Sequence, residues 1–516
     1  MRRFSAHGLV LALGLAVVPR PLDAQAAASG STRAAATITA ADVARRVGII
    51  ADDSMLGRDT PSRGLDLTAR YVADQFRRFG LRPGGDEGGW HQRYPIRRRR
   101  FDREASRVLL AANGVEAEVR FDRTARYLQG TIPAEPTTGP AVLVGGALDA
   151  DAVGRMPLRD KVVVYVSDFA APPSDRAIQV ARAIRLGAPR AVLLVANLEP
   201  QAFAARIPRT MAPRTAVDLK LVSPPHVEVT EAAVSRVLRA ANVDLHAVRS
   251  ATTPVYRALA DLRIRLELRD SVLGSLTAPN TIGILEGSDS ARKREYLVYS
   301  AHMDHIGITP GRADSINNGA DDDASGTAGV IELAQAFSRP GARPRRSIIF
   351  LTVSGEEKGL WGSRYFSEHP TVPISQIVAN LNIDMIGRNW RDTIVAIGKE
   401  HSDLGATLDR VNRAHPELRM TAIDDRWPEE RFYFRSDHYN FARKGVPILF
   451  FFNGVHPDYH QVTDSPEKID AEKEARILRL LYHLGREIGD APERPKWNPE
   501  SYREIVDDPV RPRLSP

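Results

Sequence analysis

Two stretches of the sequence decide the fold: EYLVYSAHMDHIG at residues 295–307 and SIIFLTVSGEEKG at residues 347–359. Each begins with a short apolar, β-branched run typical of a buried strand, and each run ends directly at ionisable residues. Further strands are expected at 379–383, 393–397 and 447–452, with helices between the strands at 324–337 and 472–488. This alternation predicts an α/β protein, a three-layer sandwich around a mixed, mostly parallel central sheet.

The rest of the chain is not uniform in pattern. At 516 residues it is too long for one ordinary core. Helical periodicity covers residues 38–95, whereas short β-type runs dominate residues 101–269. We therefore expect a discontinuous domain, built from residues 38–110 and 276–490, that is interrupted by a β-rich insert at 115–272.

Both ends of the chain have distinctive compositions. Two arginines precede the apolar run Gly8–Val18, so residues 1–24 are predicted to be a signal peptide cleaved after Ala24. The run is well short of the ~20 residues that span a membrane, which favours a secreted or periplasmic protein with no membrane span after cleavage. The Pro- and Arg-rich tail, 491–516, is expected to be extended or loosely docked.

Composition narrows the possible chemistry. The chain has no cysteine, which excludes disulfides, thiolate metal ligands and a cysteine nucleophile, so any metal must be held by His, Asp or Glu. The formal net charge of +7 is spread along the chain. Its one dense basic run, Arg97–Arg100, is interpreted as a solvated face, so no nucleic-acid partner is expected.

Acidic residues and histidines gather in five segments close behind predicted strands. In open α/β sheets, the loops beyond the carboxyl ends of the strands bring distant residues together at a ligand site. The candidate site residues are His302 with Asp304; Asp322 within the acidic triplet 321–323; Glu356 and Glu357; Asp384; and His460, which is preferred to its neighbour His456.

Most of these segments have an ordinary explanation when taken alone. A His-x-Asp pair is common on surfaces, acids before a helix cap its N-terminus, adjacent glutamates suit a solvated loop, and a lone histidine is usually a loop residue. Asp384, by contrast, ends an apolar strand, where an unpaired carboxylate is costly to bury. Together the segments supply imidazole and carboxylate groups without sulfur, which suit zinc in a hydrolytic site, with cobalt or manganese as substitutes.

The same segments resemble the co-catalytic two-zinc aminopeptidase family, which includes bacterial leucyl aminopeptidases, glutamate carboxypeptidases and transferrin-receptor-like proteins. The resemblance covers about residues 38–100 and 276–489, and it rests on the strings AHMDHIG, NNGADDDASGTAGV, SGEEKGLWGS, NIDMIGR and YHQVTDSPEKI. It implies the zinc exopeptidase fold. The β-rich insert is similar to a protease-associated domain, which shapes substrate access in such proteins.

The resemblance also implies a ligand set for two Zn²⁺ ions per chain. Asp322, the middle acid of its triplet, would bridge both ions. His302 and Asp384 would complete one zinc site, and Glu357 and His460 would complete the other. All five positions are present in the sequence, which is the pattern of an active enzyme.

Further residues take roles in catalysis by the same resemblance. Glu356 would be the general base for a water activated by the zinc ions, and Asp304 would contact and orient His302 without itself binding zinc. Tyr433 would help to stabilise the oxyanion, although a core aromatic is an equal alternative, and Ser436 would face the substrate. The implied function is a secreted aminopeptidase that removes N-terminal residues from peptides.

Three other functions remain open at this point. A carboxypeptidase of the glutamate-carboxypeptidase type would need basic residues in its specificity pocket, and Arg388 or Arg435 could serve. A glutaminyl cyclase would use a single zinc, which the retained His302 disfavours. A non-catalytic, receptor-like binding protein would have lost ligands, whereas the set here is intact.

Overall fold

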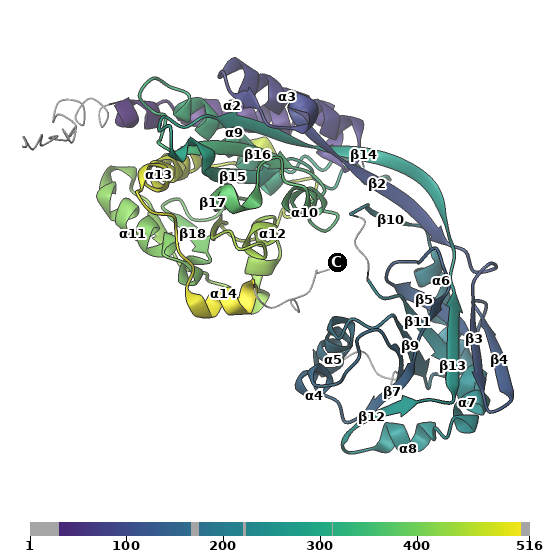
Figure 1. The fold of residues 1–516 in the computed structure, drawn as a ribbon. Coiled ribbons are helices and arrows are strands. Elements are labelled where there is room, and N and C mark those ends of the chain that lie inside the picture. Colours follow the sequence, from purple (N-terminus) through teal and green to yellow (C-terminus); the bar gives the residue numbers. More distant parts are fainter. Residues whose placement is uncertain (1–29, 167–174, 220–222, 312, 507–516) are drawn as a thin grey trace, which may run out of the picture.

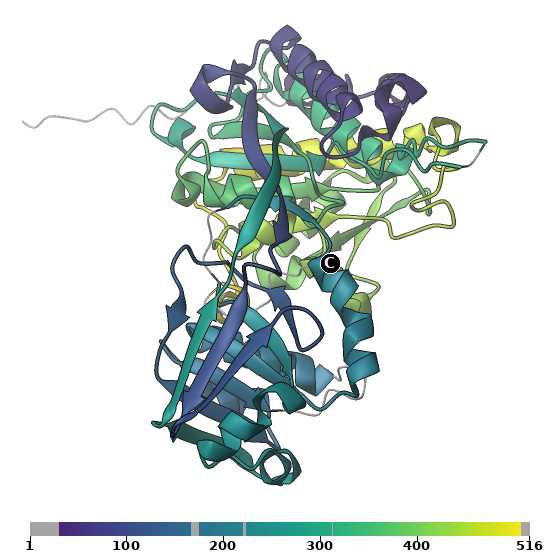
Figure 2. The ribbon, with the colours of Figure 1, turned by 90° about the vertical axis from the view of Figure 1, so that its right-hand side faces the viewer.

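The computed structural model describes residues 30–166, 175–219, 223–311 and 313–506. The expected signal peptide at 1–24 lies outside the described residues. The described chain forms two bodies that are joined by two long paired strands, β2 (His91–Phe101) and β14 (Asp270–Leu285) (Figures 1 and 2). Among the described helices, none combines the length and apolar character needed to cross a membrane.

The larger body is built on a ten-stranded mixed sheet. Its strand order is β10 (Arg214–Val217), β2, β14, β16 (Ser347–Val353), β15 (Tyr296–His302), β17 (Ile377–Ile383), β20 (Ile448–Phe451), β18 (Thr393–Ile397) and β19 (Thr421–Ile423), and β1 (Arg82–Pro83) pairs with β14. The central strands β16, β15, β17 and β20 run parallel, whereas β14 and β18 flank them in the antiparallel sense. The mixed sheet was expected, but its parallel part is confined to the centre and the β18–β19 pair.

Helices cover both faces of this sheet, which gives the expected three layers (Figure 1). Along β15, Leu297 and Tyr299 belong to the core on one face, and Val298 belongs to the core on the other, because side chains alternate along a strand. The first face carries α2 (Ala40–Ile50), α3 (Arg63–Arg78), α9 (Gly326–Phe337), α11 (Leu404–Ala414) and α13 (Ala471–Asp490). The second carries α10 (Trp361–Glu368), α12 (His438–Ala442) and α14 (Pro499–Ile505).

The helical expectation for residues 38–95 is wrong at its end, because β2 begins at His91. The run Arg97–Arg100 lies inside this strand, with three of its four side chains exposed, so it is a solvated face on a strand. Both edges of β2 are paired, one with β14 and one with β10. Backbone pairing on both sides stabilises the strand although its side chains show no apolar run.

The smaller body holds two further sheets around a shared core. Six strands form one sheet in the order β12 (Pro254–Leu259), β7 (Ala141–Gly146), β8 (Val162–Val166), β9 (Ala191–Ala196), β11 (His226–Thr230) and β5 (Ala125–Gln129). Four strands form the other, in the order β4 (Val115–Arg120), β3 (Arg107–Ala112), β13 (Leu262–Glu267) and β6 (Thr137–Thr138). The helices are α4 (Ala150–Gly154), α5 (Asp175–Leu186), α6 (Pro200–Met211), α7 (Glu231–Ala240) and α8 (Leu245–Ser250).

The tail is more ordered than its composition indicates. Residues 499–505 form α14, and Ile505 packs into the core of the second face with only 2% of its surface exposed. Trp497 forms an isolated bridge with Ser402 and donates its indole N–H to the carbonyl of Gly445. The expectation of an extended or loose tail is therefore wrong up to residue 506, because one buried side chain and one capped helix fix it.

Candidate metal centre

The parallel strands of the central sheet deliver the candidate residues to one edge. His302 is the last residue of β15, Asp384 directly follows β17, and Glu357 lies four residues beyond the end of β16. His460 lies in the loop after β20. Asp322 comes from a π-helical segment, Ala320–Ser325, that precedes α9, where a regular helix was expected to begin at residue 324.

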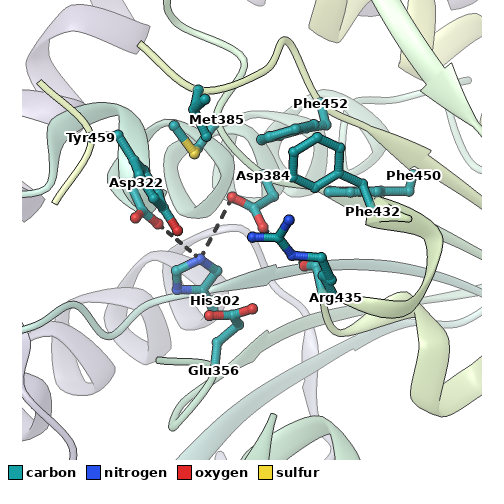
Figure 3. A pocket seen from close by; sticks show the side chains of 12 residues that line it. His302, Asp322, Glu356, Asp384, Met385, Phe432, Arg435, Phe450, Phe452 and Tyr459 are labelled. Carbon is teal, nitrogen blue, oxygen red and sulfur yellow. Dashed lines mark hydrogen bonds and ion pairs between the residues drawn. The ribbon is translucent and has the colours of Figure 1, made fainter. Parts of the chain in front are cut away.

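Two imidazoles face the two carboxylate oxygens of Asp322. Nε2 of His302 lies 3.2 Å from Oδ1 of Asp322 and 3.6 Å from Oδ1 of Asp384 (Figure 3). Nε2 of His460 lies 3.1 Å from Oδ2 of Asp322 and 3.1 Å from Oε2 of Glu357. The five predicted ligands therefore form two groups that share Asp322.

The donor set fits divalent metal ions. Ligand atoms bonded at 2.0–2.2 Å to one tetrahedral ion lie roughly 3.3–3.6 Å apart, which is close to the separations in both groups. Nε2 of His460 and Oε1 of Glu357 are buried atoms that meet their neighbours at 2.9–3.1 Å without the geometry of a regular hydrogen bond. Asp384 is 6% exposed, and burial raises the pKa of its carboxyl. Such a cluster of buried carboxylates requires compensating positive charge.

His302 is oriented by Asp304, but mainly through the main chain. Nδ1 of His302 lies 3.1 Å from the carbonyl oxygen of Asp304 and 3.8 Å from its carboxylate. A proton on Nδ1 that is donated to this carbonyl leaves Nε2 free to bind a cation. The Asp304 carboxylate instead accepts from the hydroxyl of Thr60 and from the main-chain N–H of Glu356. Burial raises the pKa of Asp304 to about 6.

The three acids of the triplet 321–323 have different roles. Oδ1 of Asp323 accepts from the N–H of Gly326, and Oδ2 accepts from the N–H of His302, so this side chain joins the start of α9 to β15. Asp321 accepts from the N–H of Gly387. The flanking acids hold the backbone, and the middle acid presents its oxygens to the imidazoles. Asp323 also has an oxygen within 4.8 Å of donor atoms of His302 and Asp384.

His305 was not singled out from the sequence, yet it is part of the centre. It is fully buried, and its Nδ1 lies 2.9 Å from Oε1 of Glu357 and 3.7 Å from Oδ2 of Asp322. These three side chains offer ligand atoms within 4.8 Å of one another. The signal in the sequence was a second histidine three positions after His302.

A cavity opens directly on the carboxylates and His302 (Figure 3). Polar residues and an apolar wall both line it, and Arg435 of the polar set lies over the ring of Phe432 at 4.7 Å. The polar residues are His302, Asp322, Glu356, Asp384, Arg435, Ser436 and Tyr459. The apolar residues are Met385, Phe432, Phe450, Phe452 and Val455.

Two tyrosines near the site have different surroundings. Tyr433 does not line the cavity: it is 5% exposed, and its ring packs edge-on against His401 at 4.5 Å, so the alternative of a core aromatic holds. Tyr459 lines the cavity instead, and its ring stacks on His460 at 3.9 Å. Burial raises the pKa of Tyr459, which keeps its phenol protonated as a hydrogen-bond donor.

Of the remaining candidates, two line the cavity and one does not. Ser436 lines the cavity and donates to Oδ2 of Asp384 at 2.9 Å, so it fixes that carboxylate. Arg435 also lines the cavity. Arg388 pairs with Asp458 at 3.0 Å and is not among the lining residues.

The two histidines that follow β20 in the sequence contact different carboxylates. His456 lies 3.3 Å from Oδ2 of Asp321, whereas His460 faces Asp322 and Glu357, as preferred. The fold and the donor set together define an α/β protein with a candidate metal centre at the carboxyl edge of its sheet.

Comparison with known sequences finds a family match for one segment of the chain. Residues 280–485, less than half of the 516-residue chain, match the sequence profile of Peptidase family M28. This confirms the family resemblance of the motifs. The matched segment contains all five predicted ligands and Glu356.

Individual relatives are similar over part of their length. A probable zinc metalloprotease of Pyricularia oryzae is 36% identical over 258 residues, which are 41% of this chain and 50% of that protein. Aminopeptidase YwaD of Bacillus subtilis is 28% identical over 209 residues, 38% of this chain and 42% of that protein. The chain thus spans about half or less of the curated relatives that it matches. Among solved structures, an aminopeptidase from Aneurinibacillus sp. strain AM-1 covers 90% of this chain and 97% of its own, with a TM-score of 0.47 and 17% identity.

Proposed function

We propose that the chain is a secreted zinc exopeptidase with two metal ions, and specifically an aminopeptidase. The observation that carries the proposal is Asp322, whose two carboxylate oxygens each face a different imidazole. A bridging carboxylate between two cations is the arrangement that this geometry supports. The match of residues 280–485 to a peptidase family and the names of the curated relatives support zinc and peptide substrates.

His302, Asp384 and Asp322 would hold one zinc ion, and His460, Glu357 and Asp322 the other. Zinc held there supplies positive charge that polarises a peptide carbonyl and lowers the pKa both of water and of neighbouring carboxyls.

Glu356 is the proton carrier of the proposed reaction. It lines the cavity beside the ligand groups, and burial raises the pKa of its carboxyl well above the ordinary value. A carboxylate with a raised pKa accepts a proton from the attacking water and returns it to the departing amine. Its main-chain N–H is anchored on Asp304, 3.3 Å away, which fixes the start of the side chain.

Tyr459 replaces Tyr433 as the proposed donor to the substrate carbonyl. Its phenol is protonated at neutral pH, and its ring is held against His460 at the cavity wall. A neutral donor at this place stabilises the negative charge that develops on the carbonyl oxygen.

The apolar wall of the cavity is proposed to bind the side chain of the substrate's first residue. Phe432, Phe450 and Phe452 give it an aromatic surface, and the guanidinium of Arg435 lies over the ring of Phe432 at 4.7 Å. The β-rich insert, about residues 115–272, is proposed to be a protease-associated domain that shapes access to this cavity. One observation favours a carboxypeptidase instead: Arg435 lines the cavity and could bind a substrate carboxylate.

Hydrolysis of matched substrates tests the proposal. The zinc-loaded protein would be assayed with leucyl and phenylalanyl amides, with the same compounds after N-acetylation, and with N-blocked peptides that end in glutamate. Cleavage restricted to free N-termini is the expected result. Preferential cleavage of the N-blocked glutamate peptides would establish the carboxypeptidase, and cleavage of none of them would reject the peptidase.

A further inference from the structure

A short segment far from residues 280–485 in sequence lies against the loops of the metal centre. It runs from Gly57 to Thr60, between α2 and α3, and thus ahead of the insert. We infer that this segment, through Arg58 and Thr60, is a positioning device that locks three loops bearing metal ligands into one geometry. The inference rests on the proposed metal centre but assigns residues that have no ligand or base role in it.

Arg58 is fully buried and donates to main-chain carbonyls on both sides of the centre. Its Nε donates to the carbonyl of Met303 at 3.0 Å, directly after His302. Its two terminal nitrogens donate to the carbonyls of Asn318 and Gly319, which lead into the segment of Asp322. A planar guanidinium is suited to such a fixed fork of acceptors, whereas a lysine ammonium is not.

The main chain of the segment adds contacts of its own. The carbonyl of Arg58 accepts from the N–H of His305 at 3.3 Å, and the carbonyl of Gly57 accepts from the N–H of Gly307 at 2.9 Å. Gly57 has φ +65°, and a Cβ there would lie 2.5 Å from the carbonyl oxygen of Gly307. The backbone of the segment and the loop after β15 therefore pack directly on each other, which leaves no room for a side chain at position 57.

Thr60 connects the third loop. Its hydroxyl donates to Oδ2 of Asp304 at 3.0 Å and accepts from the N–H of Gly355, also at 3.0 Å. Gly355 directly precedes the Glu356–Glu357 pair, which supplies the proposed base and one ligand. One hydroxyl thus sets the separation between the loop of His302 and the loop of the glutamates.

Charge and geometry make opposite predictions for Arg58. The guanidinium lies among the carboxylates of Asp304, Asp322, Asp323 and Asp464, so its positive charge by itself opposes the binding of a cation. If charge were its main effect, a neutral variant would bind metal more tightly and Arg58→Lys would resemble the wild type. If the fork of hydrogen bonds matters, Arg58→Lys weakens binding although the charge is retained.

The test measures zinc affinity by competition with a chromophoric chelator, together with the absorption spectrum of the cobalt-loaded protein. Arg58→Lys is expected to lower the affinity by about 10–100-fold, the range for residues that orient metal ligands, and to change the cobalt spectrum. The matched control is Arg346→Lys. Arg346 is 1% exposed and also donates to main-chain carbonyls, those of Ile488 and Ala491, but it lies away from the site. The control is expected to lower thermal stability without changing affinity or spectrum.

Thr60→Val supplies a second, nearly isosteric test that does not depend on the arginine variant folding. Its expected result is a loss of about tenfold or more in kcat with little change in KM, and a shifted cobalt spectrum. Thr68→Val is its control, because Thr68 is also buried in α3 and its hydroxyl donates to the carbonyl of Gly64 in the same helix. Wild-type affinity, spectrum and kcat in Thr60→Val, or wild-type affinity in a folded Arg58→Lys, would overturn the inference. Absence of metal from the wild type would instead overturn the proposed function.

Discussion

Replacing Glu356 by glutamine separates proton transfer from metal binding. Glutamine has the same shape and keeps the main-chain N–H that bonds to Asp304, so the loop should stay in place. The contacts of both imidazoles are with Asp322, Asp384 and Glu357, so neither ligand group loses a member. Loss of a general base typically costs 10²–10⁴ in rate. At 1.36 kcal/mol for each factor of ten, that is about 3–5 kcal/mol of transition-state stabilisation.

The assay compares kcat, bound zinc and thermal unfolding of the wild type and Glu356→Gln. We expect kcat to fall by about 10²–10⁴ with zinc content and Tm unchanged. The matched control is Glu357→Gln, next along the chain, which should lose zinc as well because its carboxylate contacts both His305 and His460. A Glu356→Gln variant with kcat within threefold of the wild type would refute the role of this residue as base.

Three further predictions concern the wall, the ligands and the scaffold. Val455→Ala should reduce kcat/KM for large apolar first residues by about 3–10-fold and leave alanyl substrates unaffected, because this exposed side chain lines the cavity; equal losses on both substrates would contradict it. Ser436→Ala removes a donor to a ligand carboxylate and should weaken zinc binding by about tenfold in a chelator titration, whereas unchanged affinity would leave the serine no role there. Burial by itself would raise the pKa of Glu368, but hydrogen bonds from Lys444 and Arg443 lower it to about 2. The stabilisation that the ionised Glu368 gives the folded state is therefore complete above the unfolded pKa of 4.5 and is lost as the pH falls toward 2. Glu368→Gln should lower the free energy of unfolding by about 1–2 kcal/mol at pH 7, and by progressively less in acid, as measured by denaturant unfolding. A cost that does not change with pH would refute the assignment.

Local patterns in the sequence predicted the centre of the sheet well. Strand β16 covers residues 347–353 and β18 covers 393–397, as expected, because continuous apolar runs mark strands that are buried on both faces. Acids and histidines directly behind such runs converge wherever parallel strands end at one edge. Hence the sequence alone predicts that His302 and Asp384 lie close together.

Features that depend on main-chain partners or on neighbouring layers were missed. Strand β2 carries exposed arginines, and what defines it is backbone pairing with β14 and β10. Tyr459 and Tyr433 both lie in sequence segments near the site, and only packing decides which ring faces the cavity. Arg58 bonds to main-chain carbonyls about 250 residues away, and a carbonyl acceptor leaves no signature in the residue types of the sequence.

Metal stoichiometry tests the central claim most directly. Zinc per chain would be measured by inductively coupled plasma mass spectrometry on the purified protein and on Asp322→Asn. We expect about two zinc ions per chain in the wild type and close to none in the variant, because Asp322 contacts both imidazoles. One zinc or none in the wild type, or two in the variant, would contradict a centre that is built on a shared Asp322.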